Sequence, residues 1–177
     1  MFAFLQSRPS LDEFHSLLNS KSGRWYNACL RITRDEALAE DAVQDALLKA
    51  WGQREQFRGT AELDTWIHRI ALNAAIDLMR KRQHIGNDEV DADLEAAAPQ
   101  HSPDAQYQQQ AIGSDLGSAM EQLTMMEREA FVLKHLEGWK LDEIAASHGT
   151  NVNNTKQALF RAVKKLRTAM DGWRGES

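Results

Sequence analysis

The chain has 177 residues, of which 27% are charged and 42% are hydrophobic, and its formal net charge is −5. This length fits one mid-sized domain or two small ones, and the composition is typical of a folded chain rather than a disordered one. A protein that binds only nucleic acid is usually basic. The acidic total therefore means either that DNA is not the partner or that basic patches are offset by acid elsewhere.

Cysteine and histidine usage argues against several kinds of site. The single cysteine, Cys29, cannot form an internal disulfide, which suits a reducing compartment. The six histidines are scattered, and no four-ligand zinc spacing can be built from them. We expect no metal and no cofactor. The N-terminus lacks the basic start and long apolar core of a signal peptide, and no apolar run approaches the roughly 20 residues that span a bilayer, so we expect a soluble cytoplasmic protein.

Two helix-rich blocks flank a segment of different composition. Leucine, alanine, glutamate, lysine and arginine dominate residues 11–82 and 116–172. Between them lie an acidic cluster at 88–95, two prolines and a glutamine run at 106–110, with few large apolar side chains to bury. We predict an all-α protein of two small helical domains joined by a flexible acidic linker. The predicted parts are a first domain at 1–83, the linker at 84–114 and a second domain at 115–177.

Residues 38–51 show the spacing of an amphipathic helix. The predicted core stripe contains Leu38, Ala39, Ala42, Val43, Ala46, Leu47, Ala50 and Trp51. The opposite face carries Asp41, Gln44, Asp45 and Leu48. An apolar Leu48 among polar side chains is either a contact for a partner or a lone exposed leucine, which is common.

Residues 63–82 predict a helix that is covered on two sides, as in a bundle. One apolar face contains Leu63, Trp66, Ile67, Ile70, Ala71, Ala74 and Leu78, and a second contains Leu72, Ile76 and Met79. Arg69, Asn73 and Arg80 share a flank, and a basic cluster at 80–82 is expected to end the helix. That cluster either complements the helix dipole or binds phosphates. Phe57, in the preceding loop, either packs on the core or stacks on a base.

The second block contains a helix-turn-helix pattern. The preceding helix ends at Glu137-Gly138, and a short helix around Ile144 follows. A turn at 148–150 then leads to Asn151, which stands where an N-cap belongs. The core side of the next helix contains Val152, Thr155, Leu159, Ala162, Val163 and Leu166.

The outward face of this last helix carries amide, aromatic and basic side chains. Its residues are Asn153, Asn154, Lys156, Gln157, Phe160, Arg161 and Lys164. From 156 to 167 there are five basic residues and no acidic one. Amides and arginine read base edges in the major groove, and an outward phenylalanine contacts a thymine methyl. The alternative is a solvated helix of a protein-binding module; the combination of side chains favours DNA.

Together and in this order, the segments resemble the extracytoplasmic-function (group IV) sigma factors, which keep only domains 2 and 4 of larger sigma factors. Residues 39–51 resemble conserved region 2.2, residues 57–82 resemble regions 2.3 and 2.4, and residues 136–167 resemble region 4. The resemblance implies a helical-bundle domain 2, a helix-turn-helix domain 4 and no catalysis. It implies an alternative sigma factor that binds RNA polymerase core and promoter DNA, is controlled by an anti-sigma factor, and is monomeric when free.

The resemblance also implies a role for each surface. The face of Asp41, Gln44, Asp45 and Leu48 would dock on the clamp coiled coil of the largest polymerase subunit. The loop 56–61 with Asn73 would hold a flipped base of the minus-10 element while nearby cations hold phosphates. The implied minus-10 residues are Phe57, Arg58, Gly59, Arg69, Asn73, Arg80, Lys81 and Arg82. The implied minus-35 residues are Asn153, Asn154, Lys156, Gln157, Phe160, Arg161 and Lys164. The acidic linker would thread toward the polymerase active-site cleft.

Three departures from the family pattern affect domain 4. Ala158 stands where arginine is usual, which predicts the loss of a phosphate contact. Thr150 and Thr155 replace apolar residues, which predicts looser packing of the turn, and Asn153-Asn154 replace a small residue and a threonine. Two other functions stay open: a dimeric helix-turn-helix regulator, and a sigma mimic that titrates an anti-sigma factor. We find no nucleophile–base pair, phosphate loop or metal set that would indicate an enzyme.

Overall fold

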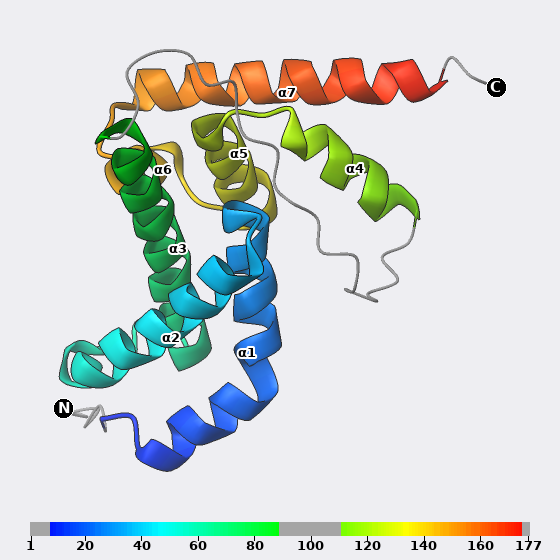
Figure 1. Cartoon of the computed structure of the whole chain (residues 1–177). Coiled ribbons are helices and arrows are strands. Elements are labelled where there is room, and N and C mark those ends of the chain that lie inside the picture. The colour runs from blue at the N-terminus through cyan, green and yellow to red at the C-terminus, as the bar shows by residue number, and fades with distance from the viewer. Residues whose placement is uncertain (1–7, 89–110, 175–177) are drawn as a thin grey trace. The chain divides into compact units, whose positions relative to one another are not determined.

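The computed structural model describes residues 8–88 and 111–174, and every regular element within these two ranges is a helix (Figure 1). The chain divides into two compact units between Pro99 and Gln100. The acidic residues from Glu89 to Glu95 and the glutamine run lie outside the described residues, so the predicted flexibility of the linker stays a prediction. No helix in the described ranges has the length and hydropathy that crossing a bilayer requires.

The first unit is a bundle of three long helices. Each helix contacts the other two, and the α2–α3 pair has the largest contact. The elements are α1 (Leu11–Thr33), α2 (Glu36–Gly52), a short 3-10 turn η1 (Arg54–Gln56) and α3 (Leu63–Asp88). Three mutually packed helices bury apolar stripes that a single helix would leave in water, which explains why the chain needs all three to form one core.

Side-chain caps set where α1 and α2 begin. Ser10 Oγ accepts the Glu13 N–H, and the Glu13 carboxylate accepts the Ser10 N–H at 2.7 Å. Asp35 caps α2 by accepting the Leu38 N–H at 3.1 Å. These bonds satisfy N–H groups that have no partner in the first turn of a helix. Arg34, with φ of 54°, ends α1 in the left-handed conformation, so α2 starts almost at once.

The core of the first unit confirms the two apolar faces predicted for α3. Leu72, Ile76 and Met79 are buried, as are Ile67 and the alanines of the other face. α3 packs against α1, whose Trp25 is fully buried. The indole Nε1 of Trp25 donates to Asp64 Oδ1 at 2.8 Å, so this buried polar group has a partner.

Two details of the first unit correct the sequence-based predictions. α3 continues to Asp88, so the basic cluster at 80–82 lies more than a turn before the helix end and the helix dipole does not explain it. Trp51, predicted in the core stripe of α2, is 37% exposed. The Phe14 ring meets Trp51 edge-on at 5.3 Å, and the Arg54 guanidinium lies 4.3 Å from the ring centroid.

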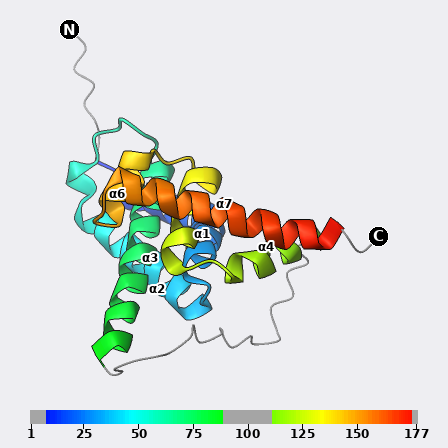
Figure 2. The ribbon, with the colours of Figure 1, turned by 90° about the horizontal axis from the view of Figure 1, so that it is seen from above.

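The second unit is built on its last and longest helix. Helices α4, α5 and α6 each contact α7, which extends along the unit (Figures 1 and 2). The elements are α4 (Ala111–Glu121), α5 (Met125–Phe131), a π-helical turn η2 (Val132–Leu136), α6 (Leu141–Ser147) and α7 (Val152–Arg174). α4 therefore begins inside the segment predicted as linker, just as α3 ends inside it.

The predicted helix-turn-helix is confirmed in α6 and α7. Gly149 turns the chain with a φ of +61°, which only glycine adopts without strain. Asn151 then caps α7, because its Oδ1 accepts the Asn154 N–H at 2.9 Å. The Thr155 hydroxyl, fully buried, donates to the Asn151 carbonyl at 3.2 Å. The turn and the cap therefore set where α7 begins.

The structure shows that two of the departures from the family pattern are buried. Thr155 is fully buried with a hydrogen bond, so the predicted looser packing is not seen at this position. Ala158 is also fully buried and belongs to the core of the second unit. Its side chain faces the interior of the unit, and the predicted loss of a phosphate contact at this position stays a prediction.

Candidate functional site

The outer face of α2 presents one apolar side chain among acids and an amide. Asp41, Gln44, Asp45 and Leu48 are all exposed, and Leu48 is 73% exposed. Their spacing of three and four residues places them on one face of the helix. Trp51, three residues after Leu48, adds a partly exposed ring near that face. The structure therefore brings the four predicted residues together.

The loop between η1 and α3 is held by an aromatic contact. The rings of Phe57 and Trp66 lie 5.3 Å apart between centroids and are tilted by 49°. Packing on the domain is thus the arrangement of Phe57 in the free protein. Arg58 and Gly59 beyond it are exposed, and Gly59 has a φ of +65°. The contact anchors one end of the loop and leaves its tip in solvent.

One flank of α3 carries two of the five cations predicted near the minus-10 element, Arg69 and Arg80. Arg69 and Lys81 are exposed, while Asn73 and Arg80 are half-buried. Spacings of four and seven residues place Arg69, Asn73 and Arg80 on the same side of the helix. Asp77 lies 3.8 Å from Arg80, one turn earlier. This flank combines an amide with positive charge, as a strand-binding surface requires.

Arg82 makes a different contact. Its Nη1 donates to Asp35 Oδ2 at 3.0 Å, which ties α3 to the N-terminus of α2. The Leu38 N–H and Arg82 hold the pKa of Asp35 below its ordinary value, against the raising effect of burial. The structure thus gives Arg82 a role in the bundle that sequence periodicity did not indicate.

The outward face of α7 is hollowed between its side chains. A shallow hollow of about 390 Å³ is lined by Asn153, Lys156, Gln157, Phe160 and Arg161. The structure therefore gathers five of the seven residues predicted for the minus-35 element in one place. They combine amide donors and acceptors, two cations and an exposed aromatic ring, the set that base-edge readout uses.

The remaining two predicted residues lie beside this hollow. Lys164 lines a larger neighbouring hollow of about 610 Å³. The lining of this hollow contains lysine and arginine side chains and no acidic one. Asn154 is exposed, but its amide donates to Thr150 Oγ1 at 2.9 Å, so it bonds to the turn. In this structure, Asn154 therefore stabilises the turn.

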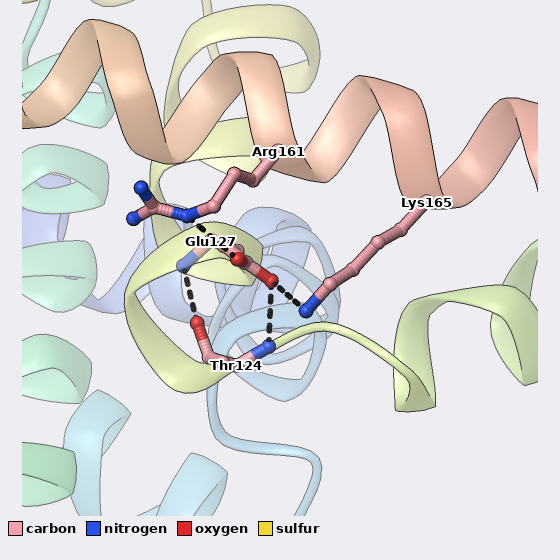
Figure 3. Close-up of polar contacts among 4 residues, drawn as sticks. All are labelled: Thr124, Glu127, Arg161 and Lys165. Carbon is pink, nitrogen blue, oxygen red and sulfur yellow. Dashed lines mark hydrogen bonds and ion pairs between the residues drawn. The ribbon is translucent and has the colours of Figure 1, made fainter.

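A buried carboxylate links α5 to α7 (Figure 3). Glu127 forms a capping box with Thr124, and its side chain is only 3% exposed. Its Oε1 accepts from Arg161 Nε at 3.1 Å, and its Oε2 accepts from Lys165 Nζ at 2.7 Å. Burial would raise the pKa of Glu127, but the hydrogen bonds from Lys165, the Thr124 N–H and Arg161 outweigh it and hold that pKa below its ordinary value.

Sequence reasoning did not find Glu127. Its cap was visible, because a threonine followed three residues later by glutamate is the pattern of a capping box. Its cationic partners were not, since they lie 34 and 38 residues further along the chain. In the described part of the protein, no group of three or more histidine, cysteine, aspartate or glutamate side chains is arranged to hold a metal ion.

Comparison with known proteins assigns both units. The model of Sigma-70 region 2 matches residues 17–85, and the model of Sigma-70 region 4 matches residues 114–166. The RNA polymerase sigma factor CarQ of Myxococcus xanthus is 31% identical over 159 residues, which cover 88% of each chain. The chain belongs to the extracytoplasmic-function RNA polymerase sigma factors.

Other relatives of this sigma factor agree. SigV of Bacillus subtilis is 29% identical over 81% of this chain and 82% of its own. SigE of Mycolicibacterium smegmatis is 29% identical over 90% of this chain, which spans 61% of SigE. Sigma factor RpoE of Bartonella quintana, solved with the anti-sigma factor NepR, superimposes with a TM-score of 0.61 at 25% identity, covering 91% of this chain and 98% of its own. CnrH, solved with the cytosolic domain of CnrY, has the same fold, with a TM-score of 0.52 at 23% identity over 92% of this chain and 90% of its own.

The region 2 match falls on the three-helix bundle and the region 4 match on the helix-turn-helix unit, so the predicted all-α, two-domain fold is confirmed. The predicted function is confirmed at the level of the family: this is an alternative sigma factor that directs transcription initiation. Its family consists of transcription factors rather than enzymes.

Proposed function

We propose that this sigma factor binds RNA polymerase core through the outer face of α2, captures the minus-10 element with α3 and its preceding loop, and reads the minus-35 element with α7. The observation that carries this proposal is the hollow on α7, where the outward residues of a helix-turn-helix second helix meet. Such helices enter the major groove of DNA and present their side chains to base edges.

The outer face of α2 suits a protein partner better than DNA. Asp41 and Asp45 would repel phosphates, whereas Leu48, one turn after Asp45, offers an exposed apolar anchor. An exposed apolar residue beside polar ones is typical of a protein interface. We assign this face to the clamp coiled coil of the largest polymerase subunit.

The loop between η1 and α3 suits one base of an unpaired strand. Phe57 packed on Trp66 supplies a fixed wall, and Arg58 and Gly59 leave an exposed tip beside it. Asn73 offers an amide that reads a base edge, and the cations of the α3 flank neutralise phosphates. Capture of one extruded base would favour the melted promoter over the closed duplex.

On α7, each side-chain type has a different task. Lys156 and Lys164 neutralise phosphates, while Gln157 and Arg161 are donors for base edges. Phe160 offers an exposed ring to a thymine methyl. Asn153 lines the same hollow at the N-terminal end of α7, where the helix approaches the groove.

Neither domain alone offers a large DNA contact. Core polymerase would hold both domains at the promoter spacing, so that their binding energies combine through effective concentration. The flexible acidic linker would allow this and would lie in a basic channel of the polymerase. Polymerase supplies the phosphodiester chemistry, and the sigma factor acts beside it in the cytoplasm, as a monomer when free.

We further propose control by an anti-sigma factor. The support is the likeness to RpoE of Bartonella quintana, which was solved in complex with NepR. A protein that covers the outer face of α2 or the hollow on α7 would block polymerase or promoter binding by occupying the same side chains. The free and inhibited forms would then differ in whether these side chains are accessible, and the side chains themselves would be the same.

Run-off transcription with purified core polymerase and a promoter library tests the proposed function. We expect new transcripts only when the protein is added. Asn73→Ala should reduce transcription from duplex promoters more than it reduces core binding, and should be relieved on promoters that are already melted. Equal loss of core binding and transcription would contradict the role of Asn73.

The two other functions make different predictions. A dimeric helix-turn-helix regulator would elute as a dimer and bind a palindromic duplex without polymerase. A sigma mimic would bind an anti-sigma factor and produce no transcripts with any promoter. The amide of Asn73 and the cations of the α3 flank favour the sigma factor over the mimic, since a mimic needs no contact with DNA.

A further inference from the structure

We propose that Glu127 is a positioning residue for promoter readout: it holds Arg161 so that the terminal amino groups of the guanidinium face the minus-35 DNA. This inference rests on the proposed minus-35 role of α7. It gives a function in specificity to a buried acid on α5, a helix that carries none of the predicted DNA contacts.

The geometry of the contact leaves the reading end of Arg161 available. Glu127 Oε1 accepts from Nε, the nitrogen nearest the side-chain stem, at 3.1 Å. Figure 3 shows the two terminal nitrogens of Arg161 directed away from Glu127. The Arg161 side chain is 53% exposed and lines the same hollow as Gln157 and Phe160. Glu127 thus restrains the stem of the side chain while the fork stays open to a ligand.

Restraint of this kind matters for an arginine that reads a base. An exposed arginine samples many rotamers, and ordering it on binding costs conformational entropy. A bidentate contact to a guanine edge needs the planar fork in one orientation. A charge-assisted hydrogen bond at Nε selects that orientation before DNA arrives. The cost of ordering is then met during folding and not during binding.

Glu127 has the properties of a rigid anchor. Its carboxylate is buried and receives the Thr124 N–H at 3.0 Å in the capping box that starts α5. The same oxygen receives Lys165 Nζ at 2.7 Å, which fixes the carboxylate from the other side. The lowered pKa of Glu127 keeps it ionised at neutral pH, so the bond to Arg161 stays charge-assisted.

Lys165 also offsets the negative charge of Glu127. A carboxylate close to DNA would repel phosphates, but here one negative charge is matched by two positive ones, and the carboxylate is almost fully covered. DNA would therefore meet a net positive cluster. Glu127 orders Arg161 without reversing the charge of the surface.

A double-mutant cycle separates positioning from simple structural support. Glu127→Gln keeps an amide oxygen for the Thr124 cap and removes the charge that orders Arg161. It is combined with Arg161→Ala, and run-off transcription is measured on promoters substituted at each minus-35 position. The matched control is Lys165→Met, which removes an ion pair to the same carboxylate but no predicted base contact.

We expect Glu127→Gln to reduce discrimination by about 5- to 10-fold, at the low end of the range for one bidentate base contact, and only at the positions that Arg161→Ala affects. In the Arg161→Ala background it should have no further effect, because its action passes through Arg161. Lys165→Met should leave the pattern of base preference unchanged, because the Thr124 N–H still holds the Glu127 carboxylate and Oε1 still accepts from Arg161 Nε. A uniform loss at all promoters, equal in both backgrounds, would overturn the inference and leave the sigma function intact.

Failure of the proposed function has a different signature. If Arg161→Ala itself leaves minus-35 discrimination unchanged, the assigned role of Arg161 is wrong and the inference falls with it.

A second measurement does not depend on transcription or on a variant that folds poorly. In the free full-length protein, the Arg161 Nε–H group should show a rigid NMR relaxation signature, unlike that of exposed Arg167. Equal mobility of the two groups would overturn the inference.

Discussion

Glu129 and His148 form an ion-pair contact of 2.7 Å between Oε2 and Nε2 inside the helix-turn-helix domain, where their side chains are 1% and 8% exposed. The other ring nitrogen, Nδ1, lies 2.8 Å from the Ile144 carbonyl and must carry a hydrogen to bond to it. Nε2 therefore either donates to the carboxylate as part of an imidazolium or accepts from a protonated Glu129. In both cases the contact ties α5 to the end of α6.

Removal of the imidazole should destabilise the second domain. His148→Ala leaves the buried Glu129 carboxyl without its hydrogen-bond partner, and a buried polar group without a partner costs about 1 to 3 kcal/mol. Glu129 Oε1 has no hydrogen-bond partner among the described residues, so it cannot compensate. Urea unfolding followed by circular dichroism should show the loss. Glu129→Gln should cost less, because a neutral amide can still donate to Nε2. Equal stability of His148→Ala and the wild type would show that the contact contributes nothing.

The stability of the second domain should depend on pH through Glu127. Its folded-state pKa is lowered by its cationic partners, so the stability it contributes is complete above its unfolded-state pKa, about 4.3, and is lost as the pH falls through the lower folded-state pKa. Glu127→Gln should be less stable than the wild type at neutral pH. The urea midpoints of the two proteins should converge in acid, and a constant difference at all pH values would argue against this linkage.

Asp35 should stabilise the first domain mainly as a helix cap. Asp35→Ala removes the bond to the Leu38 N–H and should cost about 1 kcal/mol. Asp35→Asn keeps the cap and loses only the ion pair with Arg82, which is largely exposed and should be worth less than about 1 kcal/mol. Thermal unfolding of the two variants separates these contributions. A larger loss in Asp35→Asn than in Asp35→Ala would contradict this order.

Leu48 should matter for polymerase binding and not for folding. Leu48→Ser should weaken the affinity for core polymerase at least about fivefold, as expected for an interface residue worth 1 kcal/mol or more. Its melting temperature should be unchanged, because the side chain is 73% exposed. Leu11→Ser is the matched control, since Leu11 is another exposed leucine of the same domain on α1. A similar loss of affinity in both variants would remove the special role of α2.

The features that sequence predicted well are those that depend on residues near one another in the chain. The face of Leu48 and the buried face of Leu72 follow from a period of about 3.6 residues, which any helix imposes on its side chains. The cap at Asn151 and the turn at Gly149 follow from the backbone chemistry of those residue types. The outward set on α7 was predicted in the same way.

The features that sequence did not predict depend on how the helices cross. Trp51 remains partly exposed because of what lies against α2, and local periodicity does not specify the neighbouring helix. Arg82 bonds to a residue 47 positions away, and Glu127 to Arg161 34 positions away. The sequence by itself determined which segments are helical and which side of most of them is apolar. Only the tertiary structure decided which charged groups meet, since a side chain of a few ångströms reaches only the partners that packing brings beside it.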